Sequence, residues 1–508
     1  LFLFRDNYKS IAELSVKELR LGGLRIDPKT NIGSRVTYYN NVKIRNLKNQ
    51  KSEITQVKGL PKNPKLSNIS WSPDQKRIAL TNTTETGVEL WVLELENGSV
   101  TKLTESNLNS NIGSVINWFS DSENMLVKMI SNNRRPLIDT NKIVPDGPTI
   151  STNFGEKAQN RTYQDLLKNK FDEHNFEQLS TSTIYKVSID GSVKKWMDDG
   201  MYRTISFSPN GEYVMISQIN KPFSYLVTYS RFPTETNIYN KDGDFVSNLQ
   251  KVPLIEELPK GFMSVRTGKR SFSWRPDKGA SLTYVTALDF GDPSKKVDFR
   301  DEVYELNYPF SGKGKFILKT INRFSGIDWG TKDMAIAYDT WWNTRNRKTY
   351  VFNPSNPNIK PKIISDRNYQ DTYSDPGSFL RSRNEFNRSV LKMHYGNIFL
   401  RGQGFSPSGQ FPFIDKVNTK TFEKTRVYQS SYTDKIESII DYDPKKNQLT
   451  VSIESPSEYP NYYTKKVKSG KLEKLTNLKN PFLELQNVKK EKITCLLYTS
   501  PSPRDSDS

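Results

Sequence analysis

The most regular feature of the chain is an apolar segment, a polar turn and a second apolar segment, which recur along its length. The clearest copy spans residues 69–80, where Trp71 closes the first segment and Pro73 and Asp74 form the turn. Proline presets φ and aspartate favours turns, so this copy predicts two strands joined by a tight hairpin. We expect Trp71 to pack between neighbouring sheets and Pro73-Asp74 to set the bend.

Further copies of this unit follow the same plan. They span residues 116–121, 205–217, 272–285, 327–333 and 439–444, and another is expected near 397–400. The intervals from residue 71 to 118, from 274 to 329 and from 397 to 441 fit the roughly 40–50 residues of a four-stranded blade. We therefore predict an all-β fold, a β-propeller of seven four-stranded blades, with six or eight blades as alternatives.

Residues outside the regular copies suggest the domain boundaries. Residues 1–60 form a lead-in, with a short helix expected after Ser10 and strands at 36–39 and 41–44, and residues 61–490 form the propeller. The interval from 118 to 207 is twice the usual length, and its composition predicts a short helical insertion near 162–175. Residues 495–508 depart from the preceding composition, and we interpret them as a non-native tail.

The overall composition agrees with an all-β protein. Of the 508 residues, 12% are aromatic, and 27 Gly and 27 Pro supply turns. No apolar run reaches about 18 residues, so we expect no membrane span. The net charge of +19 could attract nucleic acid, anionic lipid or acidic peptides. The basic residues are scattered and form no nucleic-acid-binding motif, so we expect no nucleic acid partner.

The sequence holds no complete catalytic or metal-binding motif. Cys495 is the only cysteine, and His174 and His394 are the only histidines, neither with a nucleophile nearby in the sequence. The Gly-x-Ser-x-Gly pentapeptide of α/β-hydrolases is absent, and the nearest segment, residues 404–409, predicts a turn. Gly-rich phosphate loops are also absent. We therefore expect no cofactor, no metal site and no catalytic residue in the chain as given.

A series of longer motifs shows a family resemblance. They cover most of residues 10–490 in order, and they lie at residues 19–28, 144–148, 161–167, 221–225, 231–233, 265–275, 287–293, 300–304, 341–347 and 373–378. With these motifs the chain resembles the propeller portion of glutamyl endopeptidases, which are serine peptidases of the prolyl oligopeptidase family found in plastids and many bacteria.

The resemblance implies a function that the chain shares with a further domain. In the family an α/β-hydrolase domain with a Ser-Asp-His triad follows the propeller, and residues 491–494 would be its start. Whether the chain alone is an enzyme is therefore uncertain, since it lacks the triad. The expected partners are a peptide substrate and the hydrolase domain in cis, and the oligomeric state is left open. We expect an exported bacterial compartment such as the periplasm, with a plastid as the alternative.

Recognition of an acidic side chain favours arginine, which can bind a carboxylate through two parallel hydrogen bonds. Four arginines within the family-like motifs are the candidates for this role, namely Arg231, Arg270, Arg345 and Arg347. For each one the alternative is a salt bridge at a strand edge or a solvated charge. A stand-alone interaction propeller of the WD-repeat or TolB-like type is the alternative function, and a polyanion binder is a third that rests on charge alone.

Overall fold

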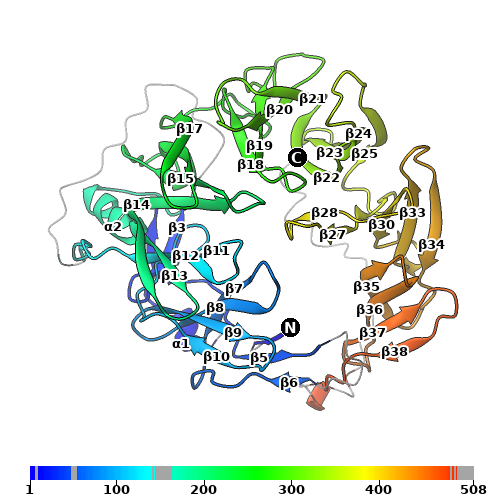
Figure 1. The fold of residues 1–508 in the computed structure, drawn as a ribbon, viewed down its shortest axis with the longest axis horizontal. Coiled ribbons are helices and arrows are strands. Elements are labelled where there is room, and N and C mark those ends of the chain that lie inside the picture. Colours follow the sequence, from blue (N-terminus) through cyan, green and yellow to red (C-terminus); the bar gives the residue numbers. More distant parts are fainter. Residues whose placement is uncertain are drawn as a thin grey trace, which may run out of the picture. The chain divides into compact units, whose positions relative to one another are not determined.

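The computed structural model describes residues 1–5, 10–46, 54–139, 142, 163–480, 483–485 and 488. In this part of the chain nearly all regular structure is β-strand, and the predicted all-β fold is confirmed (Figure 1). The chain divides into two compact units, residues 1–374 with 381–393, and residues 375–380 with 394–508. The predicted domain start at 491–494 and the predicted tail at 495–508 lie outside the described residues.

The first unit begins with two small sheets and a single helical turn, α1 (Ile11–Leu14). One sheet contains β1 (Phe2–Phe4), β5 (Asn41–Ile44) and β6 (Thr55–Gln56), and the other contains β2 (Leu19–Leu21), β3 (Leu24–Asp27) and β4 (Ile32–Gly33). Gly23 turns the chain between β2 and β3 at φ +91°, where a Cβ would lie 2.7 Å from the Thr228 Cγ2 atom. Only glycine fits this position. The strand predicted at 41–44 is confirmed, whereas Tyr39 makes only an isolated bridge to Leu66.

Four-stranded antiparallel sheets follow in the first unit, each with its strands in the order of the sequence. The first contains β7 (Leu66–Trp71), β8 (Arg77–Thr83), β9 (Val88–Glu94) and β10 (Val100–Lys102). A later sheet contains β18 (Arg270–Trp274), β19 (Ser281–Ala287), β20 (Asp301–Asn307) and β21 (Lys315–Thr320). The next contains β22 (Arg323–Thr331), β23 (Met334–Trp341), β24 (Asn346–Phe352) and β25 (Lys362–Asn368).

One long strand joins two such sheets between β10 and β18. The strands here are β11 (Ile116–Trp118), β12 (Asn124–Ile130), β13 (Ser182–Ser188), β14 (Val193–Phe207), β15 (Tyr213–Ile219), β16 (Thr234–Asn240) and β17 (Phe245–Val252), with η2 (Tyr229–Arg231) before β16. Residues 193–200 of β14 pair with β13, and residues 201–207 pair with β15. The strand therefore ends one four-stranded sheet and begins the next without a loop.

A two-stranded hairpin completes the first unit, formed by β27 (Arg381–Arg383) and β28 (Ser389–Leu391). The second unit contains the sheet of β26 (Ser378–Phe379), β30 (Asn397–Gly402), β33 (Phe413–Asn418) and β34 (Lys424–Gln429), and the sheet of β35 (Ile436–Asp443), β36 (Gln448–Glu454), β37 (Asn461–Lys466) and β38 (Leu472–Lys474). Its shorter elements are β31 (Phe405–Ser406), β32 (Gly409–Gln410) and η3 (Leu483–Leu485), and β29 (Met393–His394) lies at the boundary of the units.

The insertion helix lies further along the chain than predicted. The prediction placed it near 162–175, whereas α2 spans Lys170–Ser180. Asn169 caps its N-terminus, because the Asn169 side chain accepts a hydrogen bond from the Asp172 backbone N–H at 2.9 Å. Before the cap, Asp165 has a positive φ of 59° and accepts a 2.6 Å hydrogen bond from Arg25 Nε. This long-range contact holds the segment outside the helical region, so the helix begins later.

Apolar clusters join each sheet of the first unit to the next. One cluster combines Ala79 and Val92 of the first sheet with Trp118 and Met125 of the second. Trp118 Nε1 also donates to the Ser70 carbonyl oxygen at 3.2 Å, and Trp274 Nε1 donates to the Ser206 carbonyl oxygen at 3.0 Å. Trp118 and Trp274 thus each donate a hydrogen bond to the four-stranded sheet that precedes their own.

Trp71 departs from this pattern. It lies in the first four-stranded sheet of the sequence, so no earlier four-stranded sheet supplies a carbonyl oxygen, and its side chain is 46% exposed. The expectation that Trp71 packs between sheets is therefore wrong. Four-stranded meanders packed face to face are the blade organisation of β-propellers. The count of seven blades stays a prediction.

A buried lysine lies within this core. Lys128 on β12 is 2% exposed, and its ammonium group donates to the Ile112 backbone carbonyl oxygen. Among the described residues it has no carboxylate partner. Burial lowers the pKa of Lys128 to about 7, because the charged form loses its hydration.

Replacing Lys128 with methionine should stabilise the protein in a pH-dependent way. Because the folded-state pKa lies below the unfolded value, the unfolded chain binds the proton more tightly between about pH 7 and 10.5. The free-energy cost of burying the charged Lys128 is therefore complete below pH 7, and it decreases as the pH rises. We expect Lys128→Met to raise the free energy of unfolding of the full-length protein at pH 6.5 by on the order of a few kcal/mol, and to raise it by less at pH 9.5. The urea midpoint at each pH measures this change.

Lys194→Met is the matched control, because Lys194 lies exposed on β14. Its effect on the urea midpoint should be small and equal at both pH values. The same gain for Lys128→Met at pH 6.5 and 9.5 would contradict the inference.

Candidate functional site

The strongest candidate site in the first unit is a pocket of about 440 Å³ between the sheet of β14–β17 and the start of β18, here named the arginine pocket. Its charged lining residues are Arg203, Arg266 and Arg270, and within the described part of the chain no Asp or Glu lines it. The other polar lining residues are Thr204, Ser217, Ser230, Thr234, Thr236, Gln250 and Ser271. Guanidinium and hydroxyl groups without a carboxylate suit an anionic ligand.

Arg203 reaches the pocket because of an irregularity in β14. The register with β15 shifts between Tyr202 and Thr204, so Arg203 occupies a β-bulge, which changes the direction of a side chain. Its NH1 group donates to the Ser230 carbonyl oxygen at 3.2 Å, and its guanidinium carbon lies 5.9 Å from the centre of the Tyr229 ring. In the described chain no carboxylate forms an ion pair with Arg203.

Arg266 lies in the loop before β18 and is held by neutral acceptors. Its NH2 group donates to Gln250 Oε1 at 2.6 Å and to the Lys269 carbonyl oxygen. Burial lowers the pKa of Arg266, and the nearby charge of Arg270 lowers it further. Two guanidinium groups are thus held close together in a partly desolvated place, where an anion would be stabilised.

Arg270 is fixed by a buried network of arginines and aspartates that lies between the sheets of β18–β21 and β22–β25. Its NH2 group lies 2.5 Å from Asp301 Oδ1, and Arg323 NH1 lies 3.1 Å from the same oxygen. Asp301 Oδ2 accepts a 2.8 Å hydrogen bond from the Phe324 backbone N–H. Both oxygens of this fully buried carboxylate are therefore occupied, and the head group of Arg270 has a defined position.

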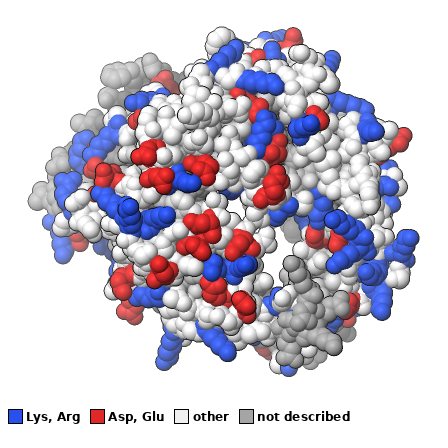
Figure 2. Space-filling model, viewed as in Figure 1, with Lys and Arg blue, Asp and Glu red and all other residues white. Residues whose placement is uncertain are grey.

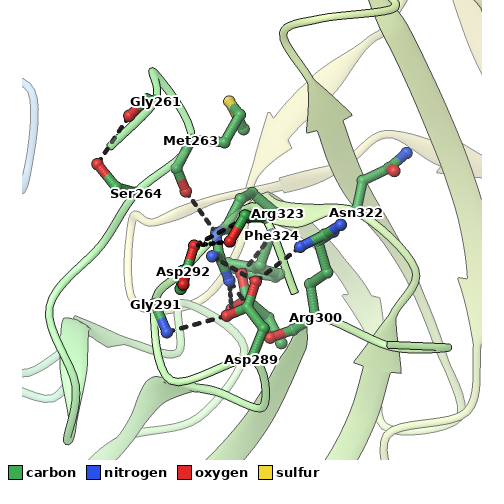
Figure 3. Close-up of polar contacts among 12 residues, drawn as sticks. Gly261, Met263, Ser264, Asp289, Gly291, Asp292, Arg300, Asn322, Arg323 and Phe324 are labelled. Carbon is green, nitrogen blue, oxygen red and sulfur yellow. Dashed lines mark hydrogen bonds and ion pairs between the residues drawn. The ribbon is translucent and has the colours of Figure 1, made fainter. Parts of the chain in front are cut away.

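Asp289 forms the second centre of this network (Figure 3). Its Oδ2 atom accepts from Arg323 NH2 at 2.7 Å and from Arg300 NH1 at 2.8 Å, and its Oδ1 atom accepts from the Gly291 backbone N–H at 3.0 Å. Arg323 also donates from Nε to the Met263 carbonyl oxygen at 2.8 Å. Two fully buried aspartates thus face three arginines, and the network keeps a positive surplus beside the arginine pocket.

The structure places the four arginines predicted from the sequence at different sites. Arg270 lines the arginine pocket, whereas Arg231, at the end of η2, lies over the Tyr163 ring at 5.3 Å. Arg345 lies over the Trp342 ring at 3.8 Å, and Arg347 lies 5.9 Å from the Tyr369 ring. For Arg231, Arg345 and Arg347 a role in binding acidic side chains stays a prediction.

Sequence reasoning missed Arg203 and Arg266. Arg266 belongs to the same motif run as Arg270, residues 265–275, so its place in that run was a usable signal. The sequence around Arg203 gives no such signal, because the direction of the Arg203 side chain depends on the bulge in β14.

Neither of the two histidines lines the arginine pocket. His174 Nε2 lies 2.9 Å from the Pro136 carbonyl oxygen, and the His394 ring packs against Tyr395 at 4.2 Å. The segment 404–409 forms the β31–β32 hairpin, which confirms the predicted turn. Among the described residues there is no cluster of three His, Cys, Asp or Glu side chains suited to a metal ion, and no helix is long and apolar enough to cross a membrane.

The charged surface does not point to another site. On the face drawn in Figure 2, basic and acidic side chains are interspersed, and no single broad basic region stands out despite the net charge of +19. The arginine pocket is distinguished by its lack of carboxylates, which the overall charge does not reveal.

Removal of one network carboxylate should destabilise the protein strongly. Asp289→Ala leaves Arg300 and Arg323 without one of their partners in a buried place, which costs about 3–5 kcal/mol. We expect a correspondingly lower urea midpoint of the full-length protein. Asp298→Ala is the control, because Asp298 is exposed in the loop before β20. Equal midpoints of the two variants would show that the network does not hold this part of the fold.

Comparison with known proteins gives relatives over almost the whole chain. No protein-family model matches it. The chain is 32% identical over 521 residues to a probable chloroplastic glutamyl endopeptidase of Oryza sativa subsp. japonica, and 31% identical over 526 residues to one of Arabidopsis thaliana. Each match covers 97% of this chain, but only 55% of the rice protein and 54% of the Arabidopsis protein. The chain thus spans about half the length of these relatives.

Solved structures give more distant likenesses. One comes from a study of two prolyl endopeptidases, with 12% identity, a TM-score of 0.42, and coverage of 89% of this chain and 54% of that chain. Another is the β-propeller domain of the trilobed protease from Pyrococcus furiosus, with 10% identity, a TM-score of 0.38, and coverage of 83% and 98%. From the two plant matches alone, the chain is a relative of proteins named glutamyl endopeptidases over nearly all of its length, and the resemblance predicted from its motifs is confirmed.

Proposed function

We propose that this chain is the propeller portion of a serine peptidase that cleaves peptides next to an acidic residue, and that the arginine pocket binds the acidic side chain. The hydrolytic step belongs to an α/β-hydrolase domain in the same polypeptide. The names of the two plant relatives support the reaction and the substrate class. The observation that carries the binding role is a pocket lined by three arginines and, in the described chain, by no carboxylate.

The geometry of the pocket explains how a carboxylate would be distinguished from an amide. Arg203 and Arg266 donate hydrogen bonds to uncharged oxygen atoms, and no carboxylate of the described residues compensates their positive charges. A glutamate carboxylate between Arg266 and Arg270 would supply a negative charge to both guanidinium groups and would offset the burial and the nearby charge of Arg270 that lower the pKa of Arg266. A glutamine side chain has the same shape but supplies no charge. Charge-assisted hydrogen bonds are roughly twice as strong as neutral ones.

Asp301 has a positioning role in this proposal. It binds Arg270 from inside the fold and shares its charge with Arg323. Arg270 therefore enters the pocket with part of its charge already compensated and with its head group fixed. Fixing the arginine before the substrate arrives reduces the entropy lost on binding.

Gating of peptide access is the second part of the proposed function. Its support is the family resemblance, in which the propeller screens peptides before they reach the hydrolase domain. The arginine pocket would add a chemical selection for acidic side chains to a selection by size. For location we propose a plastid, since both relatives carry the word chloroplastic in their names, and neither relative supports the bacterial periplasm that the sequence first suggested.

The test compares two peptides that differ only by Glu or Gln before the cleaved bond, with the full-length protein as the enzyme. We expect Arg266→Met and Arg203→Met each to lower the ratio of kcat/KM for Glu over Gln about ten- to a hundredfold, since a hydrogen bond to a charged group contributes about 1.5–3 kcal/mol. Turnover of the Gln peptide should change little, because neither arginine has an ion-pair partner in the described chain.

Arg345→Met is the comparison variant, because Arg345 lies on Trp342 and does not line the pocket. An unchanged ratio in both pocket variants would refute the binding role. A fall of the ratio in Arg345→Met alone would assign the acidic side chain to the region that the sequence motif 341–347 predicted. A full-length protein without peptidase activity would favour the stand-alone interaction propeller.

A further inference from the structure

The hairpin of residues 381–391 binds three copies of the repeated turn within the first unit. Asn387 Nδ2 donates to the Pro73 carbonyl oxygen at 2.5 Å, and Asn384 Nδ2 donates to the Pro276 carbonyl oxygen at 2.7 Å. Arg388 NH2 donates to the carbonyl oxygens of Phe207 and Ser208 at 3.1 and 3.2 Å. Figure 1 shows the β27–β28 hairpin with its tip toward the ends of the strands that precede these turns.

A polar pocket of about 380 Å³ lies between the hairpin tip and the turns, here named the turn pocket. The turn side contributes Trp71, Asn117 and Ser208 to its lining, and the hairpin side contributes Arg383, Phe386 and Arg388. In the described residues no Asp or Glu lines this pocket. It is distinct from the arginine pocket, although neighbouring residues of β14 line both.

The two arginines of the turn pocket have no counter-charge within the described residues. Arg383 NH1 donates to the Asn387 carbonyl oxygen at 2.9 Å, and the bonds of Arg388 also go to backbone oxygens. Burial lowers the pKa of Arg388, and the nearby Arg383 lowers it further. Two neighbouring guanidinium groups are thus held together by neutral acceptors, an arrangement that a bound anion would stabilise.

A second group in the turn pocket also lacks a partner. The Asn117 Nδ2 atom is buried and makes no hydrogen bond with any described residue. A buried donor without an acceptor costs about 1–3 kcal/mol, and an acceptor atom from a ligand in this pocket would remove that cost. Trp71, which is 46% exposed, offers an aromatic surface in the same lining.

We propose that the turn pocket is a binding site for a carboxylate on a peptide, with Arg383 and Arg388 as the charged contacts and Asn117 Nδ2 as a further donor. The carboxylate belongs either to an acidic side chain or to the C-terminus of a peptide, and both present two acceptor oxygens of the same geometry. Trp71 and Phe386 contact the apolar part of the peptide. The proposal does not depend on the peptidase function, because it holds equally for a propeller that binds peptides without cleaving them.

The test uses small probes that contain no bond between two amino acids and therefore cannot be cleaved as peptides. The probes are N-acetylglutamate α-amide with a side-chain carboxylate, N-acetylalanine with a terminal carboxylate, and N-acetylalanine amide without charge. Dissociation constants are measured on the full-length protein by saturation-transfer NMR. We expect at least one carboxylate probe to bind, and the neutral amide to bind at least about tenfold more weakly.

Variants then assign the bound carboxylate to a pocket. We expect Arg383→Met to weaken the bound carboxylate probe about tenfold or more, and Asn117→Leu to weaken it about fivefold or more, since these lose a charged and a neutral contact. Arg383 and Asn117 are preferred to Arg388, because Arg388 also holds the hairpin on the turn of residues 207–208. Arg266→Met reports whether a probe also occupies the arginine pocket. Lys194→Met, at an exposed position of β14 that lines neither pocket, is the control and should leave this binding unchanged.

Each other outcome overturns the proposal in a recognisable way. Loss of carboxylate binding in Arg266→Met but not in Arg383→Met would place the ligand in the arginine pocket and would leave the proposed function intact. Inorganic phosphate that binds more tightly than every carboxylate probe, with loss in Arg383→Met, would show a phosphate site instead. Equal binding of the charged and neutral probes would show that the arginines are structural. If the comparison of Glu and Gln peptides refutes the proposed function, these binding measurements still test the turn pocket.

Discussion

Contact between successive copies of the repeated turn is the constraint on which the rest of the first unit depends. The Asp74 backbone N–H donates to Ser122 Oγ at 3.0 Å, and the Asn210 backbone N–H donates to the Gly279 carbonyl oxygen at 2.9 Å. Between them, Gly211 has a φ of +77°, and a Cβ there would lie 2.3 Å from Ser120 Oγ. The turns therefore lie side by side, so one hairpin can bond to several of them.

Compensation of buried charge divides the arginines of the first unit into two groups. Arg300 and Arg323 are matched by Asp289, and Arg270 and Arg323 share Asp301, so these side chains stabilise the fold. Arg203 and Arg266 in one pocket, and Arg383 and Arg388 in the other, have no carboxylate partner in the described residues. Stability alone does not explain partly buried charges that stay unmatched, and such departures from structural rules are typical of binding sites.

The sequence was informative where local chemistry decides the structure. Proline, aspartate and glycine at the turns fix the backbone locally, so the strand pairs around residues 69–80 and 205–217 could be predicted. Asp165 shows the opposite case, since Arg25 binds it from 140 residues away in the sequence and delays the start of α2. The exposure of the Trp71 side chain could not be predicted from the sequence either, because it depends on the position of Trp71 in the first four-stranded sheet.

The candidate sites show the same division. Arg270 could be predicted because it lies in a recognisable motif, but its partner Asp301 lies on another strand. Arg203 depends on a bulge, and Arg383 and Arg388 became candidates only when the structure showed which arginines lack carboxylates. An unmatched charge is a property of the folded arrangement, so no single stretch of sequence carries it.

The long strand β14 limits how this part of the molecule can deform. Its residues 193–200 belong to one four-stranded sheet and its residues 201–207 to the next, so no flexible linker lies between the two sheets. Separating them would require β14 to bend at Gly200 or to lose its backbone hydrogen bonds to one of the two sheets. The two sheets are therefore coupled through one continuous strand, and a movement of one sheet is passed to the other through the backbone of β14.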